Sequence, residues 1–195
     1  MSRPAPATPT TVRALAYIAA AWCLFFAAVS AWQVVAGPAV GQRLAGYASG
    51  LGVMSALVGV LKLAGAAVAL AAVLAPPGLP RRPLALLGVA LWGAFGLLSL
   101  YSAGNLVITV GTVSGLLAPS AAWTAAGGVT VKAVLYVLFF LVGAALFGVL
   151  AIWFHRRHHL GWTAVVAGLV AAPLLLGLLL AVAPAVLGQW GLLPT

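Results

Sequence analysis

Lys62 is the residue whose type and position most directly suggest chemistry in this sequence. It stands near the middle of an apolar run, residues 51–74, that is long enough to form a membrane-spanning helix. A lysine at the centre of such a helix costs roughly 2.5–3.5 kcal/mol on insertion scales, and such residues usually face other helices or a cavity. Two readings follow: an anion or partner-acid site, and a structural lysine that snorkels or sits neutral with hydroxyl partners.

The usual counter-charge of a buried lysine is missing from the whole chain, which has nine Lys and Arg but no Asp or Glu. The groups left to face Lys62 are backbone carbonyls, Ser or Tyr hydroxyls, an aromatic face, a lipid phosphate, or an acid on a partner protein. The residues of this chain that we expect to contact such a ligand or partner are Lys62, Ser55, Trp92 and Tyr101.

The helical face around Lys62 is made of small residues. Positions at i, i+3, i+4 and i+7 spacing give Ser55, Gly59, Lys62, Ala66 and Ala69. Small residues mark the places where membrane helices approach closely. We therefore expect Lys62 to point at another helix and not at lipid.

The missing carboxylates exclude whole reaction classes within this chain. Paired-carboxylate hydrolysis, a Ser-His-Asp triad, an all-protein Ca²⁺ or Mg²⁺ cage and an acidic proton relay all need Asp or Glu. Neither a phosphate-binding P-loop nor a dinucleotide fingerprint is present in the sequence. We expect no enzyme activity and no cofactor.

The histidines lie in one short basic run, in which Arg156 and Arg157 separate His155 from His158 and His159. The two arginines and the lack of a carboxylate argue against a zinc site, and one shared loop argues against axial haem ligands, so we expect no metal. The better reading is a contact with anionic headgroups, which we assign to Arg81, Arg82, Arg156 and Arg157.

Composition makes lipid the expected solvent. The chain is 65% hydrophobic with a mean hydropathy of +1.24, more apolar surface than a soluble domain of 195 residues can bury. The few basic residues lie mainly between apolar runs, which is typical of topology signals in a bilayer and not of nucleic-acid binding. The predicted fold is an all-α transmembrane helical bundle, a single domain over residues 14–195 after a flexible cytoplasmic tail at 1–13.

Five spans are predicted, at residues 14–36, 51–74, 84–103, 131–154 and 161–187. Residues 105–128 are apolar but rich in Gly and β-branched residues, and could be a sixth span, a continuation of the third helix, or an ordered loop. Five spans put the three basic clusters on one side, as the positive-inside rule requires, with Arg43 as an exception. This predicts a cell-membrane protein with a cytoplasmic N-terminus and an external C-terminus.

A competing reading concerns the first span. Two arginines, an apolar stretch and then Val29, Ser30 and Ala31 resemble a secretory signal with a cleavage site, and cleavage would leave four spans. Against it, the run contains bulky aromatic residues and continues apolar to Ala36. A stripe at Trp22, Phe25, Val29 and Trp32 has helical spacing, and we interpret it as packing.

Three segments carry a family resemblance: the aromatic and small residues from Trp22 through Phe25 to Trp32, the run from Lys62 to Gly65, and the run from Trp92 through Gly96 to Tyr101. Over residues 14–155 the chain resembles small multi-pass integral membrane proteins of unknown function that are common in actinobacteria. The resemblance implies a multi-pass membrane protein and places Lys62 inside a recurring motif.

Three classes of function fit these observations: two are non-catalytic, and the third, the least favoured, is a membrane enzyme working through Lys, Ser, Tyr or His alone. The first is a subunit, scaffold or accessory protein of a membrane assembly, in which a partner protein supplies an acid to Lys62. The alternative is a small channel or carrier for an anionic or lipidic ligand with Lys62 at the site. A cavity reaching Lys62 would favour the alternative, and an ammonium group on the outer surface of the bundle would favour a protein partner. The oligomeric state is not predicted.

Overall fold

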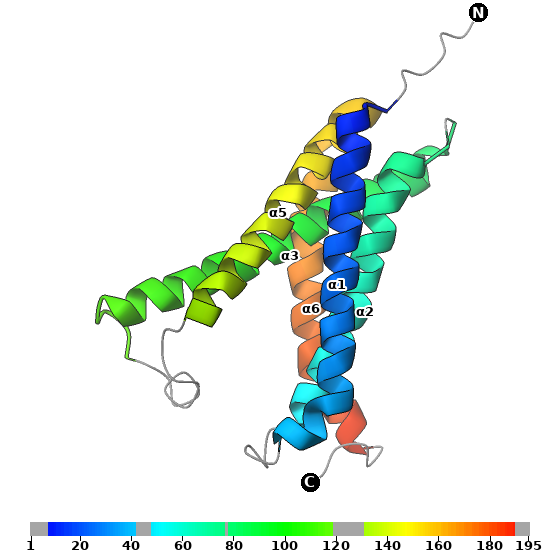
Figure 1. Ribbon diagram of the computed structural model, residues 1–195. Coiled ribbons are helices and arrows are strands. Elements are labelled where there is room, and N and C mark those ends of the chain that lie inside the picture. Colours follow the sequence, from blue (N-terminus) through cyan, green and yellow to red (C-terminus); the bar gives the residue numbers. More distant parts are fainter. Residues whose placement is uncertain (1–7, 42–47, 77, 119–130, 190–195) are drawn as a thin grey trace, which may run out of the picture.

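The computed structural model describes residues 8–41, 48–76, 78–118 and 131–189, and the regular structure within these ranges is entirely helical. The all-α prediction is therefore confirmed. The helices are α1 (Thr10–Gly41), α2 (Ala48–Leu74), α3 (Arg81–Val113), α5 (Val131–His158) and α6 (Trp162–Gln189) (Figure 1).

Four helices are long and apolar enough to cross a membrane: the spans are Thr10–Trp32, Ser55–Leu74, Arg81–Val113 and Val137–His158. A shorter apolar stretch, Trp162–Leu178, lies in α6. Helices suit such sequences because each satisfies its own backbone hydrogen bonds, which nothing in hydrocarbon could otherwise do.

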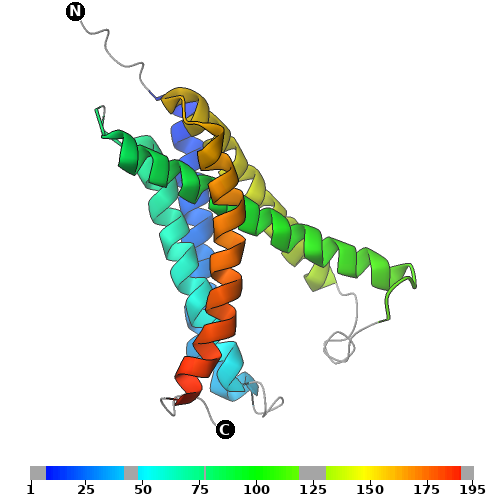
Figure 2. The same ribbon diagram turned by 180° about the vertical axis from the view of Figure 1, so that it is seen from behind.

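The five helices form two groups by direction, α1 with α2 and α6, and α3 with α5, and the two groups diverge from a common end. α1 and α2 pack against each other along most of their length, while α3 packs on both α5 and α6. Figures 1 and 2 show α3 and α5 inclined together away from the upright α1, α2 and α6. α3 has 33 residues, roughly 50 Å at 1.5 Å per residue, so an inclined path shortens the distance that it covers across a bilayer about 30 Å thick.

The basic segments meet where the two groups join. The start of α1, the connection from α2 to α3 and the connection from α5 to α6 all lie at this end of the molecule (Figure 1). The guanidinium Nη1 of Arg157 donates a hydrogen bond of 2.8 Å to the Thr8 hydroxyl, which ties the residues before α1 to the end of α5. We call this the basic end.

The structure extends the third helix beyond its predicted limit. The prediction ended it at residue 103, but α3 continues to Val113, so residues 105–113 belong to that helix. The Leu117 backbone N–H then donates to the Gly111 carbonyl at 2.9 Å, and Gly115 has a positive φ of 75°, which glycine adopts without strain. β-branched residues lower helix propensity only slightly, and propensity is a weak prior. Residues 119–130 lie outside the described ranges.

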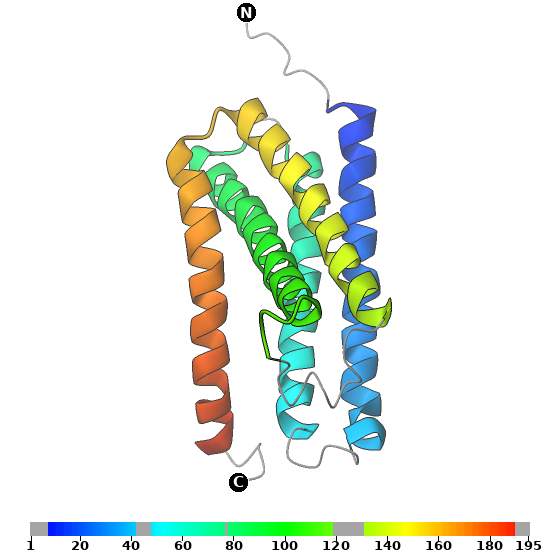
Figure 3. The same cartoon turned by 90° about the vertical axis from the view of Figure 1, so that its left-hand side faces the viewer.

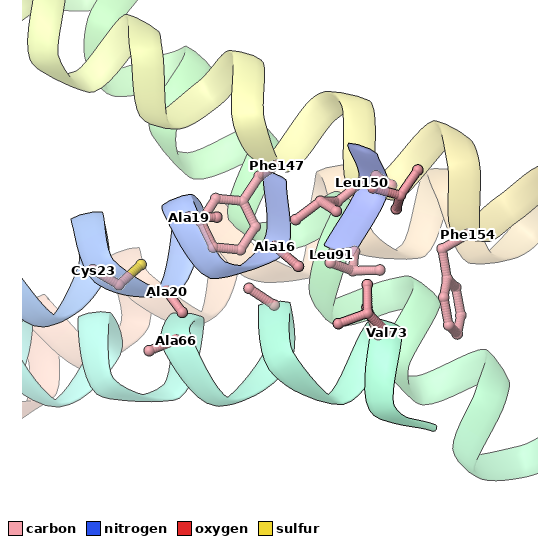
Figure 4. Close-up of a cluster of buried hydrophobic side chains, with 14 residues drawn as sticks. Ala16, Ala19, Ala20, Cys23, Ala66, Val73, Leu91, Phe147, Leu150 and Phe154 are labelled. Carbon is pink, nitrogen blue, oxygen red and sulfur yellow. The ribbon is translucent and has the colours of Figure 1, made fainter. Parts of the chain in front are cut away.

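The core is built from alanines on α1 and α2 and larger side chains on α3 and α5. Ala16, Ala19, Ala20, Ala66 and Ala69 are buried where the two N-terminal helices meet, beside Leu91, Phe147, Leu150 and Phe154 (Figure 4). Alanine allows the backbones to approach, which is how membrane helices gain packing energy without a hydrophobic driving force.

The aromatic stripe on α1 was only partly a packing face. Trp22 packs on Phe26 and Phe140, but Phe25 and Trp32 are exposed. The buried face of α1 is instead formed by Ala19, Cys23, Phe26, Ala27 and Ser30. Spacing alone identified a helical stripe but could not decide which stripe faces the bundle, because α1 is apolar on all sides.

His159, the residue that follows the end of α5, has a strained backbone conformation. We expect His159→Gly to stabilise the fold. Its φ is +47°, and the Leu160 backbone N–H donates to the His155 carbonyl at 3.2 Å, as in a Schellman cap. A side chain in this region costs roughly 1–2 kcal/mol that glycine avoids. Thermal unfolding in detergent should show a gain of about 1 kcal/mol, whereas His159→Val should lower the stability.

Candidate functional site

Lys62 is buried where α1, α2 and α5 meet. Only 9% of its surface is exposed. Its Nζ donates a long hydrogen bond of 3.4 Å to the Ser30 hydroxyl of α1, and lies 4.9 Å from the ring centre of Phe26 and 5.8 Å from that of Phe140. The ammonium therefore points into the bundle, as its small-residue face predicts.

Small neighbours make this position possible. A Cβ added at Gly59 would lie 3.4 Å from the Ser30 Cβ, so the two helices approach closely one turn from the lysine. Ala66 and Ala69 continue the same buried face of α2. Close packing of α1 on α2 brings a hydroxyl and an aromatic ring to the ammonium, and α5 adds the second ring.

A partly open cavity of about 580 Å³ reaches Lys62 and receives side chains from all five helices. This volume falls within the range of small-molecule sites, which is roughly 300–1,000 Å³. The wall is mostly apolar, and its hydroxyl groups come from Ser30, Ser55 and Tyr101, which line the cavity together with Lys62. Of these, Ser30 contacts the lysine.

The charged and nitrogen-bearing groups of the wall are donors. The Lys62 ammonium has three N–H groups, and the indole Nε1 of Trp22, a lining residue, is buried without a hydrogen-bond partner. Hydroxyls can donate or accept, and the chain has no Asp or Glu side chain. Such a wall favours an anion and disfavours a cation.

The structure brings three of the four candidate contact residues together, since Lys62, Ser55 and Tyr101 share the cavity wall. Trp92 lies elsewhere: its ring packs edge-on against Phe95 and His155. The aromatic rings over the ammonium belong to Phe26 and Phe140 instead.

Sequence reasoning missed Ser30, Phe26 and Phe140 as neighbours of Lys62. The only signal for Ser30 was a hydroxyl inside an apolar run, since such groups in lipid need a partner. Nothing in the sequence marked the two phenylalanines, because each is one of seven in the chain.

The predicted headgroup contacts lie at the basic end. Arg81 and Arg82 begin α3 and are exposed, as is Arg156 near the end of α5. The Arg157 guanidinium is partly buried and lies 5.1 Å from the Trp153 ring centre. Within the described ranges, no three His, Cys, Asp or Glu side chains are grouped so that they could hold a metal ion. Arg43 lies outside the described parts of the chain.

The close contact between α3 and α6 is made by small residues. A Cβ added at Gly93 would lie 2.9 Å from the Ala172 Cβ, and one at Gly168 would lie 2.6 Å from the Val89 carbonyl oxygen.

The fold and the cavity define a class: an all-helical protein whose helices can cross a membrane, with a buried lysine in the wall of an apolar cavity. Comparison of the chain with protein-family models, curated proteins and solved structures gives no significant match. The function is therefore inferred from the cavity and Lys62 alone.

Proposed function

We propose that this protein is a non-catalytic membrane protein that holds or carries an anionic ligand with an apolar tail. The observation that carries this proposal is Lys62 in the wall of a largely apolar cavity of about 580 Å³, in a chain without any Asp or Glu. The cavity favours the carrier reading over a lysine that merely snorkels, because the ammonium points inward.

A bound anion would add to the stabilisation of Lys62. A central lysine costs roughly 2.5–3.5 kcal/mol. A cation over an aromatic ring recovers about 0.5–2 kcal/mol for each of the two rings, and the bond to Ser30 is long at 3.4 Å, so the described contacts are of the same order as the cost. Hydrogen bonds to a charged ligand would contribute about 1.5–3 kcal/mol each.

The remaining wall suits an apolar chain. On α3 the lining residues extend from Leu86 to Tyr101, fifteen residues or roughly 22 Å of helix at 1.5 Å per residue. This exceeds half of the hydrocarbon thickness, which is about 15 Å per leaflet. The cavity therefore has room along α3 for a lipid tail, with the charged group beside Lys62.

The proposal also includes a non-catalytic role in a membrane assembly, in which a carboxylate of a partner protein takes the place of the ligand's anion. Because the ammonium points toward α1 and α5, such a carboxylate would have to enter the cavity. The carrier and the assembly versions of the proposal use the same cavity and the same lysine.

The experiment is purification in mild detergent, followed by native mass spectrometry and identification of bound lipids and proteins. We expect anionic lipids to be enriched over zwitterionic lipids relative to the membrane of origin. A stoichiometric protein partner in their place would support the assembly version. Bound lipids in the same proportions as the membrane, with no partner, would contradict both.

We further propose that α6 is a fifth span and that the basic end faces the cytoplasm, with the C-terminus outside. The gathering of basic segments at one end of the molecule supports this, because cytoplasmic loops carry an excess of Lys and Arg. The contact between Thr8 and Arg157 links the N-terminal residues to that end.

Labelling of single cysteines in a Cys23→Ala background should report this topology. Leu116→Cys, beyond the end of α3, should react with an impermeant maleimide added outside cells, and His159→Cys should react only after permeabilisation. Leu116 is exposed in the structure, so access should not limit the reaction. The reverse pattern would overturn the five-span orientation.

A further inference from the structure

We infer that the cavity opens sideways between α2 and α6, and that its ligand is an anionic membrane lipid entering there from the bilayer. This inference rests on the proposed function and adds the source of the ligand and its route. Both helices line the cavity, yet α2 packs mainly on α1 and α6 mainly on α3 (Figure 3). They are therefore two walls that do not close on each other.

The two helices place leucines at the same level on either side of the opening. α2 ends at Leu74 and α6 begins at Trp162, both toward the basic end, and the two run in opposite directions (Figures 1 and 3). Leu61 is 13 residues before Leu74, and Leu175 is 13 residues after Trp162. Each is thus about 20 Å from that end at 1.5 Å per residue, beside Lys62 in depth.

Both leucines belong to the cavity wall and to the outer surface. Leu61 is 42% exposed and Leu175 is 64% exposed, and both line the cavity. Their neighbours Leu63 and Leu174 are as exposed, at 52% and 67%, but do not line it. A residue that is on the wall and on the surface marks a rim. Leu61 and Leu175 mark it between α2 and α6, and Leu86 and Tyr101 of α3, which also line the cavity and are 70% and 45% exposed, mark further points of the rim.

The position of the rim between α2 and α6 decides what can enter there. Leu61 and Leu175 lie in the middle of the apolar helices, where the surroundings of a membrane protein are acyl chains and not water. Any anion that moves from the membrane surface to this depth loses its hydration, at a cost of several kilocalories per mole. A lipid offsets part of this cost, because its tail is already in that layer and matches the leucine rim and the apolar wall.

Charge selects among lipids once the tail has entered. The cavity wall provides the buried ammonium of Lys62, and the chain has no Asp or Glu, so a zwitterionic headgroup would bring a second cation into a site that has no acid of its own to neutralise it. An anionic headgroup brings only the negative counter-charge that the Lys62 ammonium lacks within the chain. The ligand is therefore a lipid with net negative charge.

Site-specific photo-crosslinking tests this inference with matched controls. Benzoylphenylalanine is introduced at Leu175 or Leu61 on the rim, and at Leu174 or Leu63 on the neighbouring lipid-facing surface. The full-length protein is placed in nanodiscs of phosphatidylglycerol and phosphatidylcholine in equal parts, irradiated, and analysed by mass spectrometry. Each rim position and its control share a helix, a depth and a similar exposure.

We expect the rim positions to capture phosphatidylglycerol at least about fivefold over phosphatidylcholine, and the controls to capture both equally. Lys62→Met should abolish the preference at the rim and leave the controls unchanged. Equal capture at rim and control, together with anionic lipid still bound in native mass spectra, would overturn the lateral route alone. Equal capture with no Lys62-dependent lipid in those spectra would overturn the proposed function as well.

A second variant tests the same route if the proteins substituted at Leu61 or Leu175 misfold. Ala64 is exposed and lines the cavity on α2, so Ala64→Trp places a bulky ring at the cavity wall on the α2 side of the rim. Transfer of phosphatidylglycerol from added vesicles into the binding site should slow at least tenfold. An unchanged rate in a protein of normal thermal stability would contradict entry at this rim.

Discussion

Lys62→Met should reduce the binding of anionic lipid by roughly 10–100-fold while leaving the protein as stable as before, or more stable. The lost interaction is a charge-assisted hydrogen bond or ion pair, worth about 1.5–3 kcal/mol, and 1.4 kcal/mol corresponds to a factor of ten. Methionine has a similar length and no charge, so the roughly 2.5–3.5 kcal/mol cost of a central lysine disappears. The measurements are native mass spectrometry with titrated phosphatidylglycerol and thermal unfolding in detergent.

The opposite directions of the two effects separate function from structure. If Lys62 served only to contact Ser30, its substitution would lower the stability of the protein and leave lipid binding unchanged. Lys62→Arg is the matched control, because it keeps the positive charge and should retain most of the preference for anionic lipid. Unchanged lipid selectivity in Lys62→Met at normal membrane levels would show that the residue is a structural lysine.

Ser30→Ala separates the roles of the hydroxyl and the charge. It removes the hydrogen-bond partner of Lys62, at 3.4 Å, and leaves the ammonium in place. Because that bond is long, we expect less than a threefold change in lipid binding and a loss of stability of about 1 kcal/mol or less. A loss of binding as large as that of Lys62→Met would mean that Ser30 itself contacts the ligand.

Gly168→Ala should have the largest effect on stability, a loss of about 3 kcal/mol. A Cβ at this position would lie 2.6 Å from both the Trp92 Cβ and the Val89 carbonyl oxygen, and 3.0 Å from the Gly93 backbone nitrogen. Overpacking typically costs 1–3 kcal/mol, and here two of the three atoms are backbone that no rotamer change can move. α3 and α6 would have to separate, which SDS-titrated unfolding should detect.

Gly177→Ala is the matched control on the same helix. A Cβ there meets no other residue within 4 Å, and the substitution removes only the flexibility of glycine in a helix interior. We expect a gain of stability of about 1 kcal/mol or less. Similar losses for both variants would mean that glycine at 168 is not required for the contact between α3 and α6.

Gly168 and Gly93 also line the cavity, so the predicted separation has a second consequence. Widening the space between α3 and α6 should reduce the contacts with the lipid tail. It should not remove the preference for anionic over zwitterionic lipid. Native mass spectra should therefore show less lipid in Gly168→Ala at an unchanged ratio of anionic to zwitterionic species, unlike Lys62→Met.

The helices and the direction of Lys62 were predictable from residue types. Long apolar runs can satisfy their backbone groups in lipid only as helices, and the small residues around Lys62 indicated a close neighbour. The end of the third helix was not predictable, because valines, isoleucine and glycines after residue 103 are compatible with a helix or with a loop.

The sequence by itself determined that this chain is helical, that its surface is suited to lipid, that acid-dependent catalysis is excluded, and that one mid-helix lysine has no counter-charge. Only the tertiary structure decided what surrounds that lysine. Ser30, Phe26 and Phe140 come from two other helices, and the cavity exists because α2 and α6 pack on different neighbours. An apolar helix has no polar face to show its orientation, so its neighbours follow from how small residues fit together in three dimensions.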